Sequence, residues 1–258
     1  MRTRVLAVLA VCAAVVSAVD GQAPAPGKVP TVKEVLYSAA DSIGQLRTAN
    51  EVDRIATMNY TATGTLAVGG QPCTLKEYKA SINWLHKGMR VDYTCDGQPR
   101  RVEVVNRNVA WNETTPGVGA TPAPAGAAAE RQLMIWTLPA GIIKAATAAG
   151  AKTMVAVEGG KTVLSFPVVD VPGATIRAFY NPANYLLDRV ETRLGNVVID
   201  IAYSEHGDWN GEDYLSDVQF PKRIVQKRGA ATIADLTVEK TNTYNPYVIM
   251  PVPPSIKG

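Results

Sequence analysis

The chain has 258 residues, of which 47% are hydrophobic and 19% charged, and its formal net charge is +3. This length is sufficient for one large domain or two small ones, and no composition shift marks a boundary between two. The charge is nearly balanced and dense Lys/Arg clusters are absent from the sequence, which removes any electrostatic argument for binding nucleic acid or an anionic membrane surface.

The N-terminus has the pattern of a signal peptide. Arg2 and Arg4 precede an apolar run over residues 5–16, and small residues at 16–18 form an acceptable cleavage site. The apolar run is too short for a membrane anchor. We therefore expect residues 1–18 to be removed, the mature net charge to be about +1, and the protein to be periplasmic or secreted.

The three cysteines fit the same interpretation. A lipoprotein signal that acylates Cys12 is an alternative, although valine at position 11 is a poor residue directly before such a cysteine. If Cys12 leaves with the signal peptide, Cys73 and Cys95 remain, and an even pair in an exported protein favours a disulfide. Two buried free thiols are the alternative, and metal binding is less favoured because no nearby residue completes a ligand set.

The first part of the mature chain contains a linker, a helix and several strands. Residues 19–30 are rich in Ala, Pro and Gly and indicate a flexible linker. Thr31 and Glu34 form a capping box that begins a helix with apolar residues at helical spacing. From residue 57 the period changes to two, and the expected strands are 57–68, 74–85, 89–95, 100–106 and 109–112.

The second part returns to strands after two helices. Residues 113–127 are of low complexity and predict a mobile loop. Helices are expected at 128–136 and 138–149, the second almost wholly apolar or small. Strands follow over 153–180, and residues 185–246 alternate as an antiparallel meander with a hairpin turn at Gly195-Asn196. The fold class is therefore mainly β (α+β), with one domain over 31–250, a tail over 251–258 and about 11 strands.

The sequence resembles two known families, and the first resemblance predicts that the sheet is curved. The segment from Phe220 to Val225, followed by residues 236–242, resembles the closing strands of the LolA/LolB-like carriers of lipoproteins. This resemblance implies a curved antiparallel half-barrel with two or three helices on its concave face and an acyl chain held between sheet and helices. Residues 108–112, 127–136 and 139–146 resemble the N-terminal domain of exported bacterial metallo-beta-lactamase-fold hydrolases.

The sequence does not carry the chemistry of those hydrolases. Their zinc site needs a His-x-His-x-Asp-His cluster, whereas His86 and His206 are the chain's two histidines. No nucleophile motif is recognisable either. His206, next to Glu205, is interpreted as part of a polar loop. We predict a non-catalytic protein without cofactor or metal.

The predicted function is binding of a hydrophobic ligand, a lipid or the acyl chain of a lipoprotein. The alternative is an accessory domain that partners a metallohydrolase, and a filled core in place of an open cavity would favour it. Small residues in the helix 138–149 predict unfilled space above the meander. The candidate lining residues are Leu138, Ile142, Ile143, Ala146, Leu186, Val190, Ile199, Ile201, Tyr203, Phe220, Ile224, Leu236 and Val238.

Overall fold

The computed structural model describes residues 29–46, 55–210, 218–243, 245 and 247–256. The predicted signal peptide, Cys12 and most of the predicted linker lie outside these described residues. The same is true of part of the loop that precedes Phe220.

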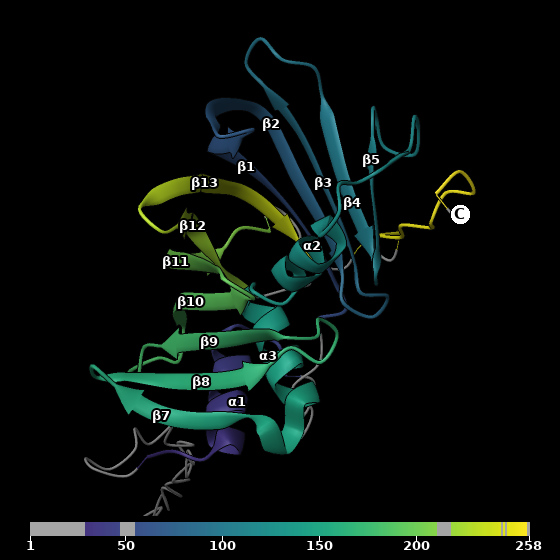
Figure 1. Cartoon of the computed structure of the whole chain (residues 1–258). Coiled ribbons are helices and arrows are strands. Elements are labelled where there is room, and N and C mark those ends of the chain that lie inside the picture. The colour runs from purple at the N-terminus through teal and green to yellow at the C-terminus, as the bar shows by residue number, and fades with distance from the viewer. Residues whose placement is uncertain (1–28, 47–54, 211–217, 244, 246, 257–258) are drawn as a thin grey trace, which may run out of the picture.

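The molecule is built on one curved, open antiparallel sheet of 13 strands (Figure 1). The strand order is β6-β5-β4-β3-β2-β1-β13-β12-β11-β10-β9-β8-β7, so every neighbour is consecutive in sequence except the pair β1 and β13. The predicted fold class is confirmed, with 13 strands in place of about 11. The strands are β1 (Thr57–Val68), β2 (Gln71–Asn83), β3 (Gly88–Cys95), β4 (Arg101–Asn106), β5 (Val109–Glu113), β6 (Thr121–Pro122), β7 (Met154–Glu158), β8 (Lys161–Pro167), β9 (Ala174–Tyr180), β10 (Leu187–Leu194), β11 (Val197–Asp208), β12 (Gln219–Arg228) and β13 (Ala231–Asn242).

Two-residue turns connect several of these strands where the sequence supplies residues that tolerate positive φ. Gly195 has φ of 58°, and the flanking residues Leu194 and Val197 pair directly. The Gly159-Gly160 turn, in which both glycines have positive φ, joins β7 to β8 in the same way. Glycine is favoured there because a Cβ atom makes this backbone region costly.

In the described part of the chain, three helices lie on the concave side: α1 (Val32–Ser42), α2 (Ala127–Ile135) and α3 (Pro139–Ala149), the last continued by a single 3-10 turn over Gly150–Lys152. The predicted capping box of α1 is present, since Thr31 Oγ1 accepts from the Glu34 amide at 3.2 Å and Glu34 Oε2 accepts from the Thr31 amide at 2.6 Å. Helix α1 packs on α3, α3 on β8, and α2 on β3, β4 and β5.

The predicted alternation of the meander is confirmed with one correction. Val190, Ile199 and Ile201 point into the core, and on the opposite face Arg189 pairs with Asp200. Leu187, and not Leu186, is the buried leucine at the start of β10. The pairing of β10 with β9 shifts between Leu187 and Arg189, and such a bulge changes which face the preceding residues occupy.

Two segments predicted as loops are ordered. Within residues 113–127, β6 pairs with β5, and buried Glu113 accepts from the Trp111 indole and the Gly117 amide, both at 2.7 Å. His206 lies inside β11, where it pairs with Pro221, so it does not belong to a loop. Burial lowers the pKa of the His206 imidazole, and nearby Asp188 partly opposes that effect.

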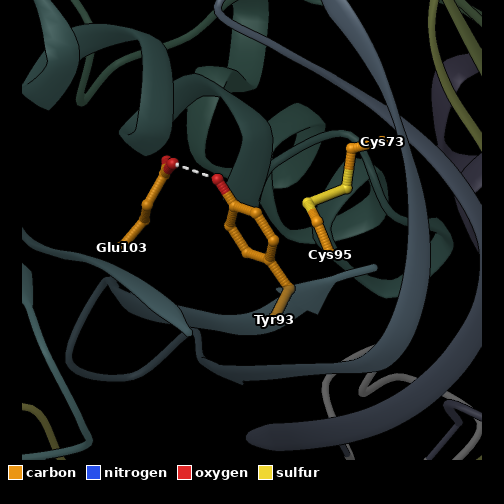
Figure 2. Close-up of a disulfide and its surroundings, with 4 residues drawn as sticks. All are labelled: Cys73, Tyr93, Cys95 and Glu103. Atoms are coloured by element: carbon orange, nitrogen blue, oxygen red, sulfur yellow. Dashed lines mark hydrogen bonds between the residues drawn. A yellow bond between two sulfur atoms is a disulfide. The ribbon is translucent and has the colours of Figure 1, made fainter. Parts of the chain in front are cut away.

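The predicted disulfide between Cys73 and Cys95 is present, with a Cα–Cα distance of 5.5 Å (Figure 2). Asn83 pairs with Gly88, so the turn lies at residues 84–87 and β2 ends two residues before the expected strand 74–85 does. A register shift near the other end of the hairpin brings Leu75 opposite Cys95. Cys73 is then two positions farther along the same face, close enough for a diagonal bond.

The C-terminal segment covers part of the convex face. Val248 and Met250 pack with Val102, Val104 and Trp111 in a small second cluster. The segment is also held by its backbone, because Asn83 Nδ2 donates to the Val248 carbonyl at 2.7 Å and Asn106 Nδ2 to the Met250 carbonyl at 2.6 Å.

Within the described ranges, no single helix has the length and apolar character needed to cross a membrane; α2 and α3, extended to Lys152, meet those criteria only as a pair bent by 101°.

Candidate functional site: two cavities beneath helix α2

A cavity of about 240 Å³ lies between α2 and the middle of the sheet, where β1 meets β13. We call it the tyrosine cavity because Tyr60, Tyr78 and Tyr93 form one of its walls. The remaining wall is mostly aliphatic, with one charged pair, Glu103 and Arg131. The other lining residues are Leu66, Ala67, Val68, Met89, Val91, Met134, Thr137, Leu138, Gln226, Ile233, Ala234 and Leu236.

A second cavity of about 170 Å³ lies on the other side of α2, and we call it the β10–β11 cavity. Arg131, Met134, Gln226 and Ile233 line both cavities, so only a few side chains separate them. Its own lining residues are Glu130, Leu133, Thr192, Leu194, Val197, Ile199 and Arg228.

A bulge in β13 shapes the shared wall. Gln226 pairs with Ala234 and Lys227 with Thr232, which leaves Ile233 as an extra residue. A bulge lets two consecutive residues turn toward the same side of a strand, and both Ile233 and Ala234 line the tyrosine cavity. Space remains there because Ala234 is small.

The tyrosine wall is built by cross-strand pairing. Tyr78 on β2 lies directly opposite Tyr93 on β3, and the ring of Tyr60 on β1 lies 5.8 Å from that of Tyr78. The hydroxyl oxygens of Tyr60 and Tyr78 are 3.3 Å apart, and either can be the donor. Burial raises the pKa of Tyr60 and raises that of Tyr78 well above its ordinary value, so both phenols stay protonated at neutral pH.

The charged pair is held in a fixed network at the edge of the tyrosine cavity. Tyr93 donates to Glu103 Oε1 at 3.0 Å (Figure 2), and burial, reinforced by this carboxylate, raises the pKa of Tyr93. Arg131 Nη2 lies 3.1 Å from Glu103 Oε2 and donates to Asn112 Oδ1 at 2.7 Å. Its Nη1 donates to the carbonyls of Val104 and Trp111.

Three of the thirteen predicted lining residues line one of the two cavities, and the others do not. Leu138 and Leu236 line the tyrosine cavity and Ile199 lines the β10–β11 cavity. Leu186 is partly buried at the start of the meander. The other nine are buried in the main core without lining either cavity, and their role as ligand contacts stays a prediction: Ile142, Ile143, Ala146, Val190, Ile201, Tyr203, Phe220, Ile224 and Val238.

The thirteen predicted lining residues include none of the three tyrosines of the tyrosine wall and no residue of α2. The alternation of β2 and β3 places Tyr78 and Tyr93 on buried faces, and this signal was available in the sequence. Arg131 stands between Glu130 and Gln132 in the predicted helix, so the local sequence does not single it out. That Tyr60 joins them near Leu236 depends on the pairing of β1 with β13, which no local pattern reveals.

The two histidines lie in separate elements, His86 in the turn between β2 and β3 and His206 in β11. Across the described part of the chain, no group of three or more His, Cys, Asp or Glu residues is placed to hold a metal ion.

Comparison with known proteins finds structural similarity but no sequence match. No protein-family model matches the chain, and no curated protein matches its sequence. Among solved structures, the crystal structure of a LolA superfamily protein from Nitrosomonas europaea is similar to it, with a TM-score of 0.49 and 10% sequence identity. The match covers 84% of this chain and 94% of the other.

Proposed function

We propose that this protein binds a hydrophobic ligand, the acyl chain of a lipid or lipoprotein, in the tyrosine cavity, and that it does so without catalysis. The observation that carries the proposal is the cavity itself, a mainly apolar space next to a filled core. Ligand sites typically occupy about 300–1,000 Å³ and have mainly apolar walls with a few placed polar groups. The two cavities together reach the lower part of that range.

A flexible chain suits this shape because it can extend across both cavities. The two cavities share Met134 and Ile233, so a narrow ligand that passes between these side chains would occupy both. Each buried methylene contributes about 0.8 kcal/mol, and affinity then depends on how many methylenes remain inside after the cost of association.

Three further points support an exported carrier. The predicted signal peptide directs the chain out of the cytosol, and a disulfide such as Cys73–Cys95 is typical of oxidising compartments. The sequence resemblance to LolA/LolB-like carriers points to the same class of ligand. Periplasmic or secreted localisation is part of this proposal.

The test is a titration of the delipidated mature protein with the neutral fluorescent probe N-phenyl-1-naphthylamine. We expect saturable binding, and we expect lipid to co-purify with the protein and be detected by mass spectrometry. Ala234→Phe should weaken probe binding at least tenfold, because the ring fills the tyrosine cavity. Ala202→Phe is the matched control, since Ala202 is exposed on β11.

An interaction module for a separate metallohydrolase is the second candidate. It is favoured by the exposed apolar side chains of Leu85, Tyr247 and Ile249, because exposed apolar surface often marks a protein interface. Wild-type protein without saturable probe binding and without co-purifying lipid would replace the carrier proposal with this one.

A further inference from the structure

The hydroxyl pair of Tyr60 and Tyr78 leaves one proton without a protein acceptor in the described part of the chain. Each phenol has one O–H and can accept as well. Only one of the two can donate across their 3.3 Å contact. Among the residues described, the structure shows no other hydrogen-bond partner for either hydroxyl. Both side chains are buried and both line the tyrosine cavity, and a buried donor left without an acceptor is unfavourable.

The remaining proton therefore has a natural acceptor in a ligand. Because burial raises the pKa of both phenols, the pair presents a neutral donor and not a phenolate. A ligand that buries a carbonyl oxygen at this wall would satisfy the donor, whereas bare hydrocarbon would leave it unsatisfied.

The charged residues that line the two cavities already have partners of opposite charge. Glu103 is paired with Arg131 at 3.1 Å. Glu130 and Arg228, on the β10–β11 cavity, are 3.8 Å apart. Arg131 also donates to two backbone carbonyls and to Asn112. A ligand carboxylate that entered the cavities would have to compete for these cations, and burying a carboxylate without a cation is costly.

We infer that the tyrosine cavity selects an acyl chain whose head is a neutral hydrogen-bond acceptor, an ester or amide carbonyl, over the free fatty-acid anion and over plain hydrocarbon. The Tyr60–Tyr78 pair is the specificity-determining donor, and Glu103 disfavours the anion. This inference rests on the proposed function and names the chemical class of its ligand.

The variant Tyr60→Phe/Tyr78→Phe isolates the donor. Removing both members of a buried hydrogen bond together is close to neutral for folding, unlike removing one. Tyr203→Phe is the matched control: Tyr203 is also a buried tyrosine, its hydroxyl donates to the Thr137 carbonyl at 2.9 Å, and it lines neither cavity.

The experiment measures displacement of N-phenyl-1-naphthylamine by methyl octanoate, octane and octanoate at pH 7. The readout is the ratio of the affinity for methyl octanoate to the affinity for octane. A change in cavity shape that affects both ligands equally leaves this ratio unchanged. We expect the double variant to lower this ratio about fivefold to tenfold, as the loss of one hydrogen bond implies, and Tyr203→Phe to leave it unchanged. A double variant with the wild-type ratio overturns the role of the pair while probe binding keeps the proposed function intact.

A separate variant tests whether Glu103 excludes the anion. Glu103→Gln removes the anion from the cavity edge and leaves Arg131 without its carboxylate partner, so octanoate should bind several-fold more tightly while methyl octanoate changes little. Equal octanoate affinity in Glu103→Gln and wild type overturns the exclusion of the anion. Failure of the wild type to bind the probe at all is a different result, because it removes the proposed function itself.

Discussion

Lys144 shows how a single charged residue is tolerated at a packed helix. It lies on α3 among buried alanines and isoleucines, with its ammonium 5.8 Å from the centre of a Trp84 ring. Burial lowers the pKa of Lys144 from 10.5 to about 8. The charged form is therefore less stable in the folded protein than in the unfolded chain.

This shift predicts a pH dependence of stability. Between about pH 8 and 10.5 the unfolded chain binds more protons at this position than the folded protein, so the free energy of unfolding should rise with pH. The gain is up to about 3 kcal/mol at 1.36 kcal/mol per pKa unit. Lys144→Met should remove this rise, as measured by urea unfolding from pH 7 to 10.5. Parallel curves for wild type and variant would contradict it.

Other residues show where sequence patterns stop being informative. Glu113 follows Trp111 by two positions in a stretch that predicts a mobile loop, yet its carboxylate is buried and accepts two hydrogen bonds, with Arg90 3.5 Å away. Arg90 is 23 residues earlier in the chain. The contact between Glu113 and Arg90 depends on strand pairing, which composition does not reveal. Composition alone therefore predicts a mobile loop over residues 113–127.

At the scale of elements, local chemistry predicted most of the fold. The capping box of α1 and the Gly195-Asn196 hairpin act within a few residues, and both are confirmed. The bulge at the start of β10 and the one at Ile233 were not predictable, because they arise where neighbouring strands fit together. The cavity depends on the second bulge, so its position was missed with it.

The C-terminal segment is an element whose contribution can be measured with adjacent residues. Met250 is 4% exposed and packs on the convex face of the sheet, whereas Ile249 is 57% exposed. Met250→Ser should lower the free energy of unfolding by about 2–4 kcal/mol through the lost burial and the cavity left behind. Ile249→Ser should change it by less than about 0.5 kcal/mol. Urea unfolding of both variants gives the comparison, and equal effects would show that the segment does not stabilise the sheet.

For the whole molecule, the pairing of β1 with β13 is the decisive contact. Strands β1–β6 and β7–β13 each form by hairpins and short connections, and this one ladder, between residues about 175 positions apart, joins them into a single sheet. The tyrosine cavity lies at the same place, with Tyr60 and Leu66 from β1 and Ile233 and Leu236 from β13 in its lining. A bound ligand would therefore contact both halves of the sheet.

Hydrogen exchange should show whether a bound ligand contacts both halves of the sheet. A ligand at about 100 times its dissociation constant stabilises the folded protein by about 2.7 kcal/mol, which slows amides that exchange through opening of its site by up to about 100-fold. With methyl octanoate we expect the slowing in β1 and β13, measured by mass spectrometry of peptides from Thr57–Val68 and Ala231–Asn242. Peptides from β7 and β8 serve as the internal control, because neither strand lines the tyrosine cavity. Slowing confined to β7 and β8, or equal in all peptides, would mean that the ligand does not join the two halves at the ladder between β1 and β13.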